Sequence, residues 1–400
     1  MPAGELAARY PRVALTHEWL TVPGGSEKVV AAILELLPHA EIFTTVFEPR
    51  SFPELADDRV HASVLDRLPG ARTQYPKMLP LMDAAWRRFD LSAYDLVVSS
   101  SHACAKNVRT PTDTVHVCYC HTPMRYLWDP AFMAGERLGA VGRVVFRAAL
   151  PRLRRTDLRG VAGVDRFVAN STVVADRIAR FYGRDAQVVH PPVDVEELLG
   201  RPRRAAAGAP YLVFGRVVPY KRVDLAVRAC ARLGRPVVVA GEGRDLERVR
   251  AVAGPQATFT GRVSDAQLGE LLATSRALLL PGEEDFGIVP VEAQAAGLPV
   301  IGFGAGGVRD SVRDGVTGVL YDDGSLDGLL AAIARFEGLQ LAEEAIRRNA
   351  RGFARSRFLE EFEAVLLSAR AGERRPAVPA APRPSAPPRL QMPSPSADRD

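Results

Sequence analysis

Short apolar runs that alternate with helical stretches fill most of this chain, and they occur in two series. The first series ends near residue 200, and the second begins after a polar, basic stretch at 201–208. Runs that are apolar throughout are typical of parallel strands buried on both faces of a sheet. Two such series therefore predict two doubly wound α/β domains. The expected strands span 12–16, 41–47, 95–100, 115–120, 166–170 and 187–190, then 211–215, 236–241, 257–261, 277–282, 299–304 and 318–322.

The composition fits a soluble globular protein, with 47% hydrophobic and 25% charged residues in 400. No apolar run reaches 18 residues, so we expect no spanning helix. The N-terminus lacks the apolar core of a signal peptide, which predicts a cytoplasmic protein. The net charge of +5 permits attraction to phosphates or anionic lipids, but nucleic acid is not an expected partner. The four cysteines are expected to be small buried hydrophobic residues.

The segment 281–304 holds two carboxylates at a loop-to-helix junction. Glu284 lies in an acidic loop after an expected strand, and Glu292 follows eight residues later. Pro290 suits the first turn of a helix, Gly297 suits its end, and Glu292 is expected within the first turn. Carboxylates accept hydrogen bonds from vicinal hydroxyls, so the pair suits a sugar and a ribose. On spacing alone, a solvated loop and a helix-start charge explain the same residues.

Two cations follow the first strand of the second series. Gly215 frees the backbone there, and Arg216 and Lys221 lie five residues apart. Such a pair can hold one diphosphate, the guanidinium as a fork and the ammonium as a point charge. It would also neutralise a leaving nucleoside diphosphate. Ordinary surface cations are the alternative, and we expect this for the next residue, Arg222.

Two features of the first series also point to phosphate or sugar chemistry. Gly24 and Gly25 precede a helix with Glu27 in its first turn, and glycines there let the backbone approach a phosphate. A tight turn would need the same glycines. His121 is expected at the carboxyl end of a strand, at the rim of a cleft, where a structural role is the alternative.

Together these motifs resemble the family 4 retaining glycosyltransferases of the GT-B fold. Glu284 and Glu292 form E-x7-E, with Phe286-Gly287 between them and A-x-A-x-G-x-P-V after them. The G-R-x4-K motif stands where this family has it, in the second domain. The segment H-T-P-M-R-Y-L-W, which begins at His121, resembles bacterial enzymes of polysaccharide and glycolipid synthesis, many of them mannosyltransferases.

The resemblance implies roles for these residues. It places Glu284, His121, Arg216 and Lys221 in catalysis. The residues that it implies in substrate binding are Gly24 and Gly25 at the distal phosphate, Arg216 and Lys221 at the diphosphate, Gly241, Arg262 and Val263 at the base, Glu284, Phe286, Gly287 and Ile288 at the sugar and phosphates, and Glu292 at the ribose.

The resemblance also implies the architecture, which is two facing Rossmann-like domains with a cleft between them. We expect an acceptor-side domain over 1–200, a nucleotide-sugar domain over 201–353 and a helix at 354–370 that crosses back to the first domain. The remainder, 371–400, is rich in Pro, Ala, Ser and Arg and is expected to be disordered. The family needs no cofactor and no catalytic metal. The D-x-D motif at 398–400 lies in that tail.

One rival interpretation is a dinucleotide-binding oxidoreductase. The stretch 302–307 satisfies G-x-G-x-x-G after a strand, and Asp322 lies about twenty residues on. However, the helix that follows, about 308–313, is too short for an ordinary crossover. We therefore expect this glycine loop to bring backbone close to the sugar and the diphosphate.

The expected partners are a nucleoside diphosphate sugar and a glycan or glycolipid acceptor. The preferred donor is GDP-mannose, and the acceptor expected from the family is a lipid-linked saccharide or a cell-envelope glycan. A UDP-hexose donor and a non-catalytic sugar-nucleotide-binding module are the alternatives. Arginines over 143–159, interleaved with apolar residues, permit peripheral contact with an anionic membrane at its inner face. A solvated helix pair would also explain that stretch.

Overall fold

The computed structural model describes residues 4–55, 57–130, 133 and 139–373, and it divides them between two parallel sheets. The first sheet has seven strands in the order β3-β2-β1-β4-β5-β6-β7. Their bounds are β1 (Val13–His17), β2 (Glu41–Thr44), β3 (Val60–Ala62), β4 (Leu96–Ser101), β5 (Val115–Cys120), β6 (Arg166–Ala169) and β7 (Ala186–Val188).

The second sheet has six strands in the order β10-β9-β8-β11-β12-β13. This is the doubly wound order, in which the sheet grows in one direction from β8 and then in the other from β11. Loops diverge at that point and leave a crevice at the carboxyl ends of the strands. The bounds are β8 (Tyr211–Phe214), β9 (Val237–Ala240), β10 (Ala257–Gly261), β11 (Leu278–Leu280), β12 (Val300–Phe303) and β13 (Gly318–Tyr321).

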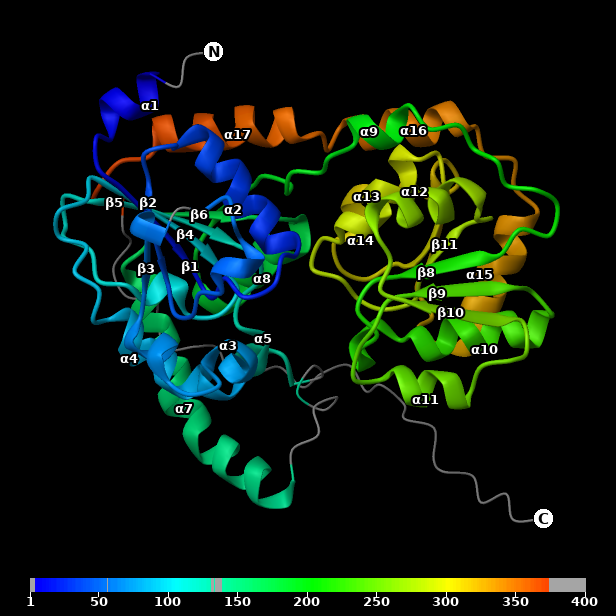
Figure 1. The fold of residues 1–400 in the computed structure, drawn as a ribbon, viewed down its shortest axis with the longest axis horizontal. Helices are drawn as coiled ribbons and strands as arrows, with labels where there is room; N and C mark the ends of the chain where they lie inside the picture. The colour runs from blue at the N-terminus through cyan, green and yellow to red at the C-terminus, as the bar shows by residue number, and fades with distance from the viewer. Residues whose placement is uncertain (1–3, 56, 131–132, 134–138, 374–400) are drawn as a thin grey trace.

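Helices cover both faces of each sheet (Figure 1). In the first domain they are α1 (Gly4–Arg9), α2 (Gly25–Leu36), α3 (Ala71–Gln74), α4 (Leu79–Trp86), α5 (Arg125–Trp128), α7 (Ala140–Ala162) and α8 (Thr172–Tyr182). The short helix α9 (Glu196–Leu199) comes next in the chain and lies over the second domain (Figure 1). In the second they are α10 (Val223–Leu233), α11 (Leu246–Ala251), α12 (Asp265–Thr274), α13 (Ile288–Ala295), α14 (Val308–Ser311), α15 (Leu326–Glu337) and α16 (Glu343–Arg351). None of the helices within the described ranges is long and apolar enough to cross a bilayer.

The last helix, α17 (Arg355–Ser368), returns to the first domain (Figure 1). Its buried residues Phe358 and Phe362 join the core between the first sheet and α2. Both rings meet the buried Tyr119 of β5, at centroid distances of 5.7 and 5.8 Å. The first domain is therefore built from two separate parts of the chain.

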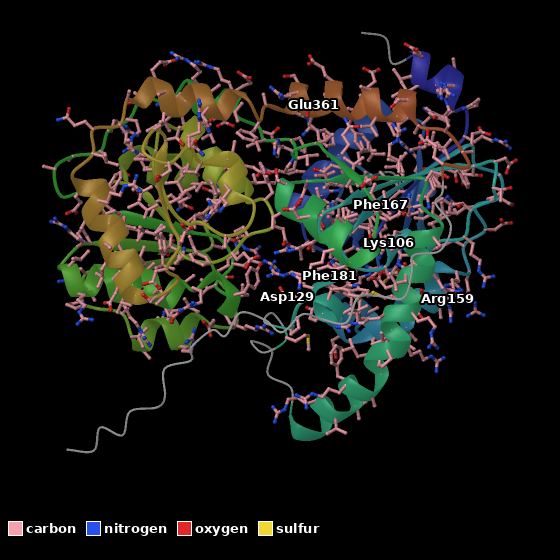
Figure 2. The ribbon with its side chains drawn as sticks, turned by 180° about the vertical axis from the view of Figure 1, so that it is seen from behind. Lys106, Asp129, Arg159, Phe167, Phe181 and Glu361 are labelled. Atoms are coloured by element: carbon pink, nitrogen blue, oxygen red, sulfur yellow. The ribbon has the colours of Figure 1, made fainter. Side chains whose placement is uncertain are left out.

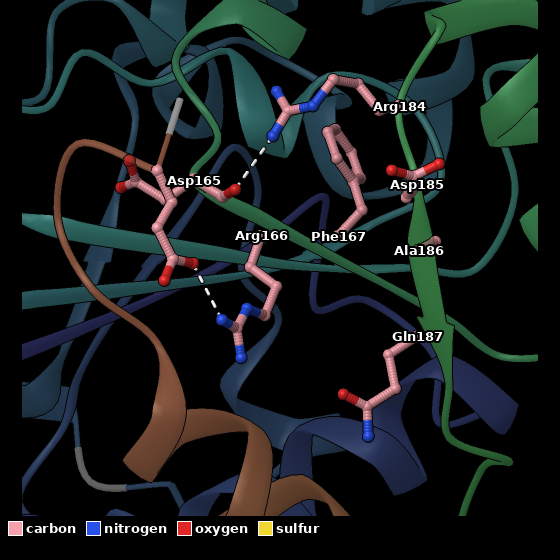
Figure 3. A pocket seen from close by; sticks show the side chains of 8 residues that line it. Asp165, Arg166, Phe167, Arg184, Asp185, Ala186 and Gln187 are labelled. Atoms are coloured by element: carbon pink, nitrogen blue, oxygen red, sulfur yellow. Dashed lines mark hydrogen bonds and ion pairs between the residues drawn. The ribbon is translucent and has the colours of Figure 1, made fainter. Parts of the chain in front are cut away.

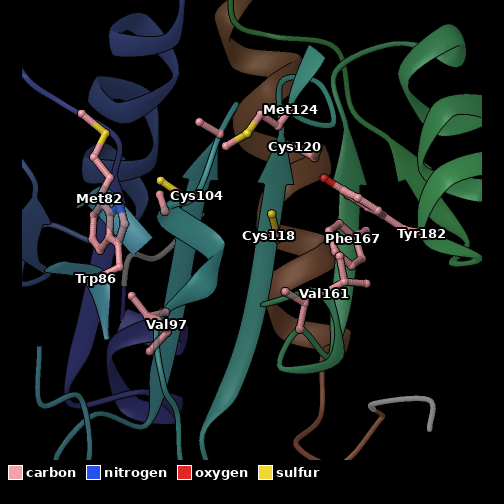
Figure 4. Close-up of a cluster of buried hydrophobic side chains, with 14 of the residues drawn as sticks. Met82, Trp86, Val97, Cys104, Cys118, Cys120, Met124, Val161, Phe167 and Tyr182 are labelled. Atoms are coloured by element: carbon pink, nitrogen blue, oxygen red, sulfur yellow. The ribbon is translucent and has the colours of Figure 1, made fainter. Parts of the chain in front are cut away.

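The opposite face of the first sheet packs on α4, α7 and α8. Cys118 and Cys120 of β5 point into this core together with Cys104 (Figure 4). All four cysteines, Cys230 of the second domain included, are buried free thiols, as expected. Burial raises the pKa of the Cys120 thiol well above its ordinary value. These thiols therefore act as small core side chains.

The predicted pair of doubly wound domains is confirmed, and each of the expected strands is present. The short edge strand β3 was not predicted, because Val60–Ala62 is too brief and too polar to give a strand pattern. The expectation that Glu292 lies in a first helical turn is wrong. The helix α13 begins at Ile288, so Pro290 lies in its first turn, as expected, but Glu292 lies in its second turn. The predicted disorder after residue 373 concerns residues outside the described ranges.

Candidate active site

Two loops meet at the point where the strand order of the second sheet reverses. One follows β8 and contains the short helical turn η6 (Pro219–Lys221), and the other follows β11 and holds the acidic residues. A Cβ on Gly282 would stand 2.5 Å from the carbonyl oxygen of Tyr220 and from Cα of Lys221. No side chain fits there, so glycine holds the two loops against each other.

This contact brings Lys221 to Glu284, as the motifs predicted. Lys221 Nζ lies 2.8 Å from Glu284 Oε1, and the side chains are only 17% and 16% exposed. Burial acts to lower the pKa of Lys221, but the Glu284 carboxylate outweighs it and leaves that pKa above its ordinary value. Lys221 is therefore a fixed cation at the crevice.

Arg216 projects from the same loop and is exposed. Its guanidinium donates a 3.4 Å hydrogen bond to the Tyr220 hydroxyl, beside Lys221. The loop is shaped by close backbone packing, because a Cβ on Gly241 would stand 1.9 Å from the carbonyl oxygen of Gly215. The second domain thus presents two cations and one carboxylate together, while Arg222 is exposed outside this group, as expected.

Glu292, the second carboxylate of E-x7-E, contacts the facing domain. Its carboxylate accepts a 2.9 Å hydrogen bond from Lys28, which lies on α2 of the facing domain. Burial acts to lower the pKa of Lys28. The attraction of the Glu292 carboxylate outweighs this effect, so the pKa of Lys28 lies above its ordinary value. A Cβ on Gly25 would lie 3.1 Å from Ile288 at the start of α13. The glycine loop at Gly24 and Gly25 therefore faces the first turn of α13 across the cleft.

The acidic loop is held from the first domain by Arg177 of α8. Its guanidinium forms ion pairs with Asp285 and, at 2.5 Å, with Glu283. Ser171, the N-cap residue of α8, accepts from the Val174 amide at 3.3 Å and also donates to the Asp285 carbonyl at 2.5 Å. Sequence reasoning missed Arg177, because a lone arginine on a helix carries no motif.

The glycine loop at 302–307 supports the acidic loop. The helix that follows, α14, has 4 residues, which confirms that it is too short for a dinucleotide crossover. A Cβ on Gly306 would stand 2.2 Å from the carbonyl oxygen of Glu284, and one on Gly307 would stand 2.4 Å from that of Asp285. The Gly307 amide donates to Glu284 O at 2.9 Å. The glycines therefore let backbone pack against the acidic loop.

Phe286 contributes to packing, because its side chain is 3% exposed and joins an apolar cluster at the domain junction. Its ring lies 5.3 Å from His190, which pairs with Asp310 of α14 at 3.2 Å. Gly287 adopts a left-handed φ of 86° at the cap of α13. The chain can turn there only because Gly287 has no Cβ, so the amides of Gly287 and Ile288 end up beside Glu284.

The predicted base contacts lie farther along the same edge of the sheet. Arg262 and Val263 follow β10, which is separated from β8 by β9. Arg262 is exposed and Val263 is half-buried. These residues share the crevice edge with Gly241 but lie two strands from the Lys221–Glu284 pair.

In the first domain, His121 lies at the end of β5, at the carboxyl edge of the sheet. Its Nε2 is 2.8 Å from Ser100 Oγ at the end of β4. Ser100 Oγ is also 3.0 Å from Nδ1 of His17 at the end of β1, and Nε2 of that ring is 3.1 Å from Glu27 Oε1. Burial lowers the pKa of His121 well below its ordinary value, and the rings of His102 and His17 add to the effect. His121 is therefore neutral at physiological pH.

The segment after His121 divides into a packing part and a cleft part. Trp128 is buried and donates from Nε1 to Asp157 at 2.7 Å. Asp157 in turn pairs with Lys106 at 2.5 Å, and both side chains are 2% exposed. Arg125 reaches the acidic loop at 3.8 Å from Asp285. Trp128 thus anchors the segment, while Arg125 faces the second domain.

A separate hollow of about 460 Å³ lies at the amino ends of β6 and β7 (Figure 3). This is the opposite edge of the first sheet from His121, so the hollow is distinct from the crevice. The lining residues are Asp165, Arg166, Phe167, Arg184, Asp185, Ala186, Gln187 and Glu373.

Comparison with known proteins gives two family models in succession. The model described as Glycosyltransferase Family 4 matches residues 23–197, and the model described as Glycosyl transferases group 1 matches residues 204–353. A D-inositol 3-phosphate glycosyltransferase of Geodermatophilus obscurus is 33% identical over 241 residues, which are 52% of this chain and 54% of that protein. One of Mycobacterium tuberculosis is 32% identical over 216 residues, covering 46% of this chain and 45% of the relative. The chain thus spans about half the length of the curated relatives that it matches.

Solved structures share the fold. The lipopolysaccharide outer core galactosyltransferase WaaB matches with a TM-score of 0.63 at 18% identity, over 89% of this chain and 99% of that one. The Anabaena protein HepE, solved with UDP-glucose, also matches with a TM-score of 0.63 at 16% identity, over 89% and 99% of the two chains. With both family models in order along two facing Rossmann-like domains, this chain belongs to the family 4 glycosyltransferases of the GT-B fold.

Proposed function

We propose that this protein transfers a hexose from a nucleoside diphosphate sugar to an acceptor, with the anomeric configuration retained. The observation that carries the proposal is the buried pair of Lys221 and Glu284, 2.8 Å apart at the crevice, with Arg216 beside it. Two cations next to one carboxylate match the charges of a diphosphate joined to a hydroxyl-rich sugar.

Each member of this group has a distinct task. Lys221 and Arg216 neutralise the charge that develops on the leaving diphosphate. Glu284 accepts hydrogen bonds from hydroxyls of the transferred sugar, and the first turn of α13 offers the backbone amides of Gly287 and Ile288. The acceptor enters from the first domain, between the glycine loop and His121, and the leaving phosphate takes its proton. Closure of the two domains excludes water and limits hydrolysis.

Ribose binding at Glu292 requires the cleft to change. In this structure the Lys28 ammonium is hydrogen-bonded to the Glu292 carboxylate. The ribose hydroxyls would replace Lys28, whose ammonium would then be free to meet a phosphate.

GDP-mannose is the proposed donor, because the H-T-P-M-R-Y segment resembles mannosyltransferases of polysaccharide synthesis. UDP-hexoses are the alternative, supported by the related fold that was solved with UDP-glucose. The proposed acceptor is a lipid-linked saccharide or a cell-envelope glycan. The names of the curated relatives make D-inositol 3-phosphate a further acceptor to test.

A donor panel tests the proposal directly. GDP-mannose, UDP-glucose and UDP-N-acetylglucosamine are compared by thermal shift and by release of nucleoside diphosphate. At a donor concentration of about 100 Kd we expect about 2.7 kcal/mol of stabilisation, which raises the melting temperature by several degrees. Stabilisation without turnover on any acceptor would favour the non-catalytic module. If no sugar nucleotide stabilises the protein, the proposed function is wrong.

We further propose that transfer needs no metal, because Arg216 and Lys221 supply the positive charge at the diphosphate. Dialysis against EDTA is expected to leave the initial rate unchanged within about twofold, since no divalent ion bridges the phosphates. The measurement is donor turnover before and after chelation, with Mg²⁺ or Mn²⁺ added back as a control. Loss of activity that a metal restores would contradict this part of the proposal.

Peripheral membrane contact through α7 is a further part of the proposal. The helix extends away from the first domain, with Arg159 among its side chains (Figures 1 and 2). Val144 and Val145 are 68% and 62% exposed, and Arg147 is exposed beside them. Arg154 does not belong to this surface, because it donates to the Leu127 carbonyl at 2.8 Å and lies over Trp128.

The contact predicts sedimentation with vesicles that contain acidic phospholipid. Replacing the exposed Arg147, Arg152 and Arg155 with glutamate should abolish it, because each basic residue near such a surface contributes about 1 kcal/mol. A matched control places the same charge change at Arg250, Arg351 and Arg357. If the native protein does not sediment with these vesicles at low salt, the proposed membrane contact through α7 is wrong.

A further inference from the structure

Four side chains form a continuous hydrogen-bonded chain along the carboxyl edge of the first sheet. Glu27 lies in the first turn of α2, and His17, Ser100 and His121 end the adjacent strands β1, β4 and β5. The successive contacts are 3.1, 3.0 and 2.8 Å. His17 and Ser100 are fully buried, so solvent does not compete for the contact between them. The strand order of this sheet reverses between β1 and β4, so the chain lies at its switch point.

The chemistry of the four groups gives this chain one direction. A carboxylate can only accept, so Glu27 requires the proton of His17 to be on Nε2. Nδ1 of a neutral His17 then has a lone pair and accepts from the Ser100 hydroxyl. The Ser100 oxygen in turn accepts from Nε2–H of His121. When both rings are neutral, each of these donors has one proton to give, so the arrangement determines the protonated nitrogen of both rings.

The Glu27 end of this chain is fixed by its surroundings. Burial acts to raise the pKa of Glu27, but its hydrogen bond with His17 outweighs this and leaves the pKa lowered. The Ser26 hydroxyl also donates to Glu27 at 3.0 Å. Glu27 is therefore an ionised acceptor at neutral pH.

The His121 end faces the cleft. His121 is half-buried, and its ring centroid lies 6.1 Å from that of His102. Burial lowers the pKa of His102, and the charge of Arg216 in the facing domain contributes to this. The two histidines are thus on the side of the first domain that meets the diphosphate-binding loop.

We propose that Glu27, His17 and Ser100 are positioning residues that hold His121 as the Nε2–H tautomer, so that its unprotonated Nδ1 accepts a hydrogen bond from a substrate hydroxyl. The second half of this statement rests on the proposed function. The first half concerns the protein alone and can be tested without substrate.

The tautomer can be read by NMR on the whole chain labelled with ¹⁵N-histidine. The chain has 7 histidines, and the signals of His121 are assigned by their loss in His121→Gln. At about pH 8.5, well above the ordinary histidine pKa of about 6.5, long-range ¹H–¹⁵N correlation should show Nε2 protonated and Nδ1 unprotonated. Protonation of Nδ1 in the native chain would overturn the proposal, whether or not the protein turns over a sugar nucleotide.

Ser100→Ala should remove this preference and give a mixture of tautomers at His121. The matched control is Ser99→Ala on the same strand, whose hydroxyl bonds Thr16 and His116 on the opposite face of the sheet. The control should leave His121 unchanged. If Ser100→Ala does not fold, Glu27→Leu tests the chain from its other end, because His17 then loses the acceptor that fixes its proton. An unchanged tautomer in the folded variant would contradict the proposal.

Activity provides the second measurement. Ser100→Ala should lower kcat by about tenfold, as expected when a group that orients another is removed, with the donor KM changed by less than about twofold. Ser99→Ala should retain native kcat. A change confined to KM would refute the assigned role of His121 Nδ1. Failure of the donor panel, with the tautomer as predicted, would instead count against the proposed function alone.

Discussion

Replacing Lys221 with methionine is expected to lower kcat by about 100- to 1,000-fold, the loss seen when one fixed group that stabilises transition-state charge is removed. Methionine keeps most of the length of the side chain but cannot neutralise the leaving diphosphate. It also leaves Glu284 without the partner that now lies 2.8 Å away. The measurement is the rate of nucleoside diphosphate release at saturating donor and acceptor.

The matched control is Arg222→Met, which removes one charge at the next residue. Arg222 is exposed, and its guanidinium donates to the Gly324 carbonyl at 3.4 Å. We expect its kcat to stay within about threefold of the native value, because the charge of an exposed side chain is screened by solvent. Equal losses in both variants would show that general positive charge matters, and the specific role of Lys221 would then be wrong.

Replacing Lys106 with methionine is expected to destabilise the first domain by about 3–5 kcal/mol, the cost of leaving one member of a buried ion pair without its partner. Lys106 and Asp157 are both 2% exposed and 2.5 Å apart, and this pair joins α7 to the loop after β4. Burial acts to lower the pKa of Lys106, and Asp157 more than offsets it, so the ammonium is charged in the folded protein.

Urea unfolding followed by tryptophan fluorescence measures the free energy of unfolding of the first domain. The chain has 3 tryptophans, Trp19, Trp86 and Trp128, and all lie in the first domain. The double variant Lys106→Met with Asp157→Leu should recover part of the loss, because no unpaired charge remains buried. A single variant that costs less than about 1 kcal/mol would contradict the prediction and would mean that the Trp128 N–H, alone or with water, is enough to stabilise the Asp157 carboxylate.

Much of the fold could be predicted because parallel strands that are buried on both faces leave continuous apolar runs. The apolar run at 115–120 predicted β5 with its observed bounds, and the run at 257–261 did the same for β10. The short strand β3 gave no such signal, since its three residues Val-His-Ala are only partly buried. Glu292 was wrongly expected in the first turn of α13 because Pro290 can occupy any position of that turn, and the cap at Gly287 makes Pro290 the third residue of the helix.

The site was predictable only where its residues are close in sequence. Motif spacing placed Lys221 near Arg216, and the resemblance placed Glu284 beside them. The contacts of Arg177 with the acidic loop and of Lys28 with Glu292 join residues 106 and 264 positions apart. Such pairs depend on how the two domains face each other, which periodicity and local motifs do not encode. The chain of contacts from Glu27 to His121 lies within the first domain, and it was missed because it joins the ends of strands that are far apart in the sequence.

The return of α17 to the first domain has a consequence for synthesis on the ribosome. Phe358 and Phe362 complete the core over Tyr119, so the nascent first domain keeps an open apolar face until residues 355–368 have emerged. The intervening second domain, complete in its own sheet, is free to fold during that interval. The half that was made first is therefore completed only after the second domain has been made, and its unfinished surface is exposed to chaperones and to aggregation until then.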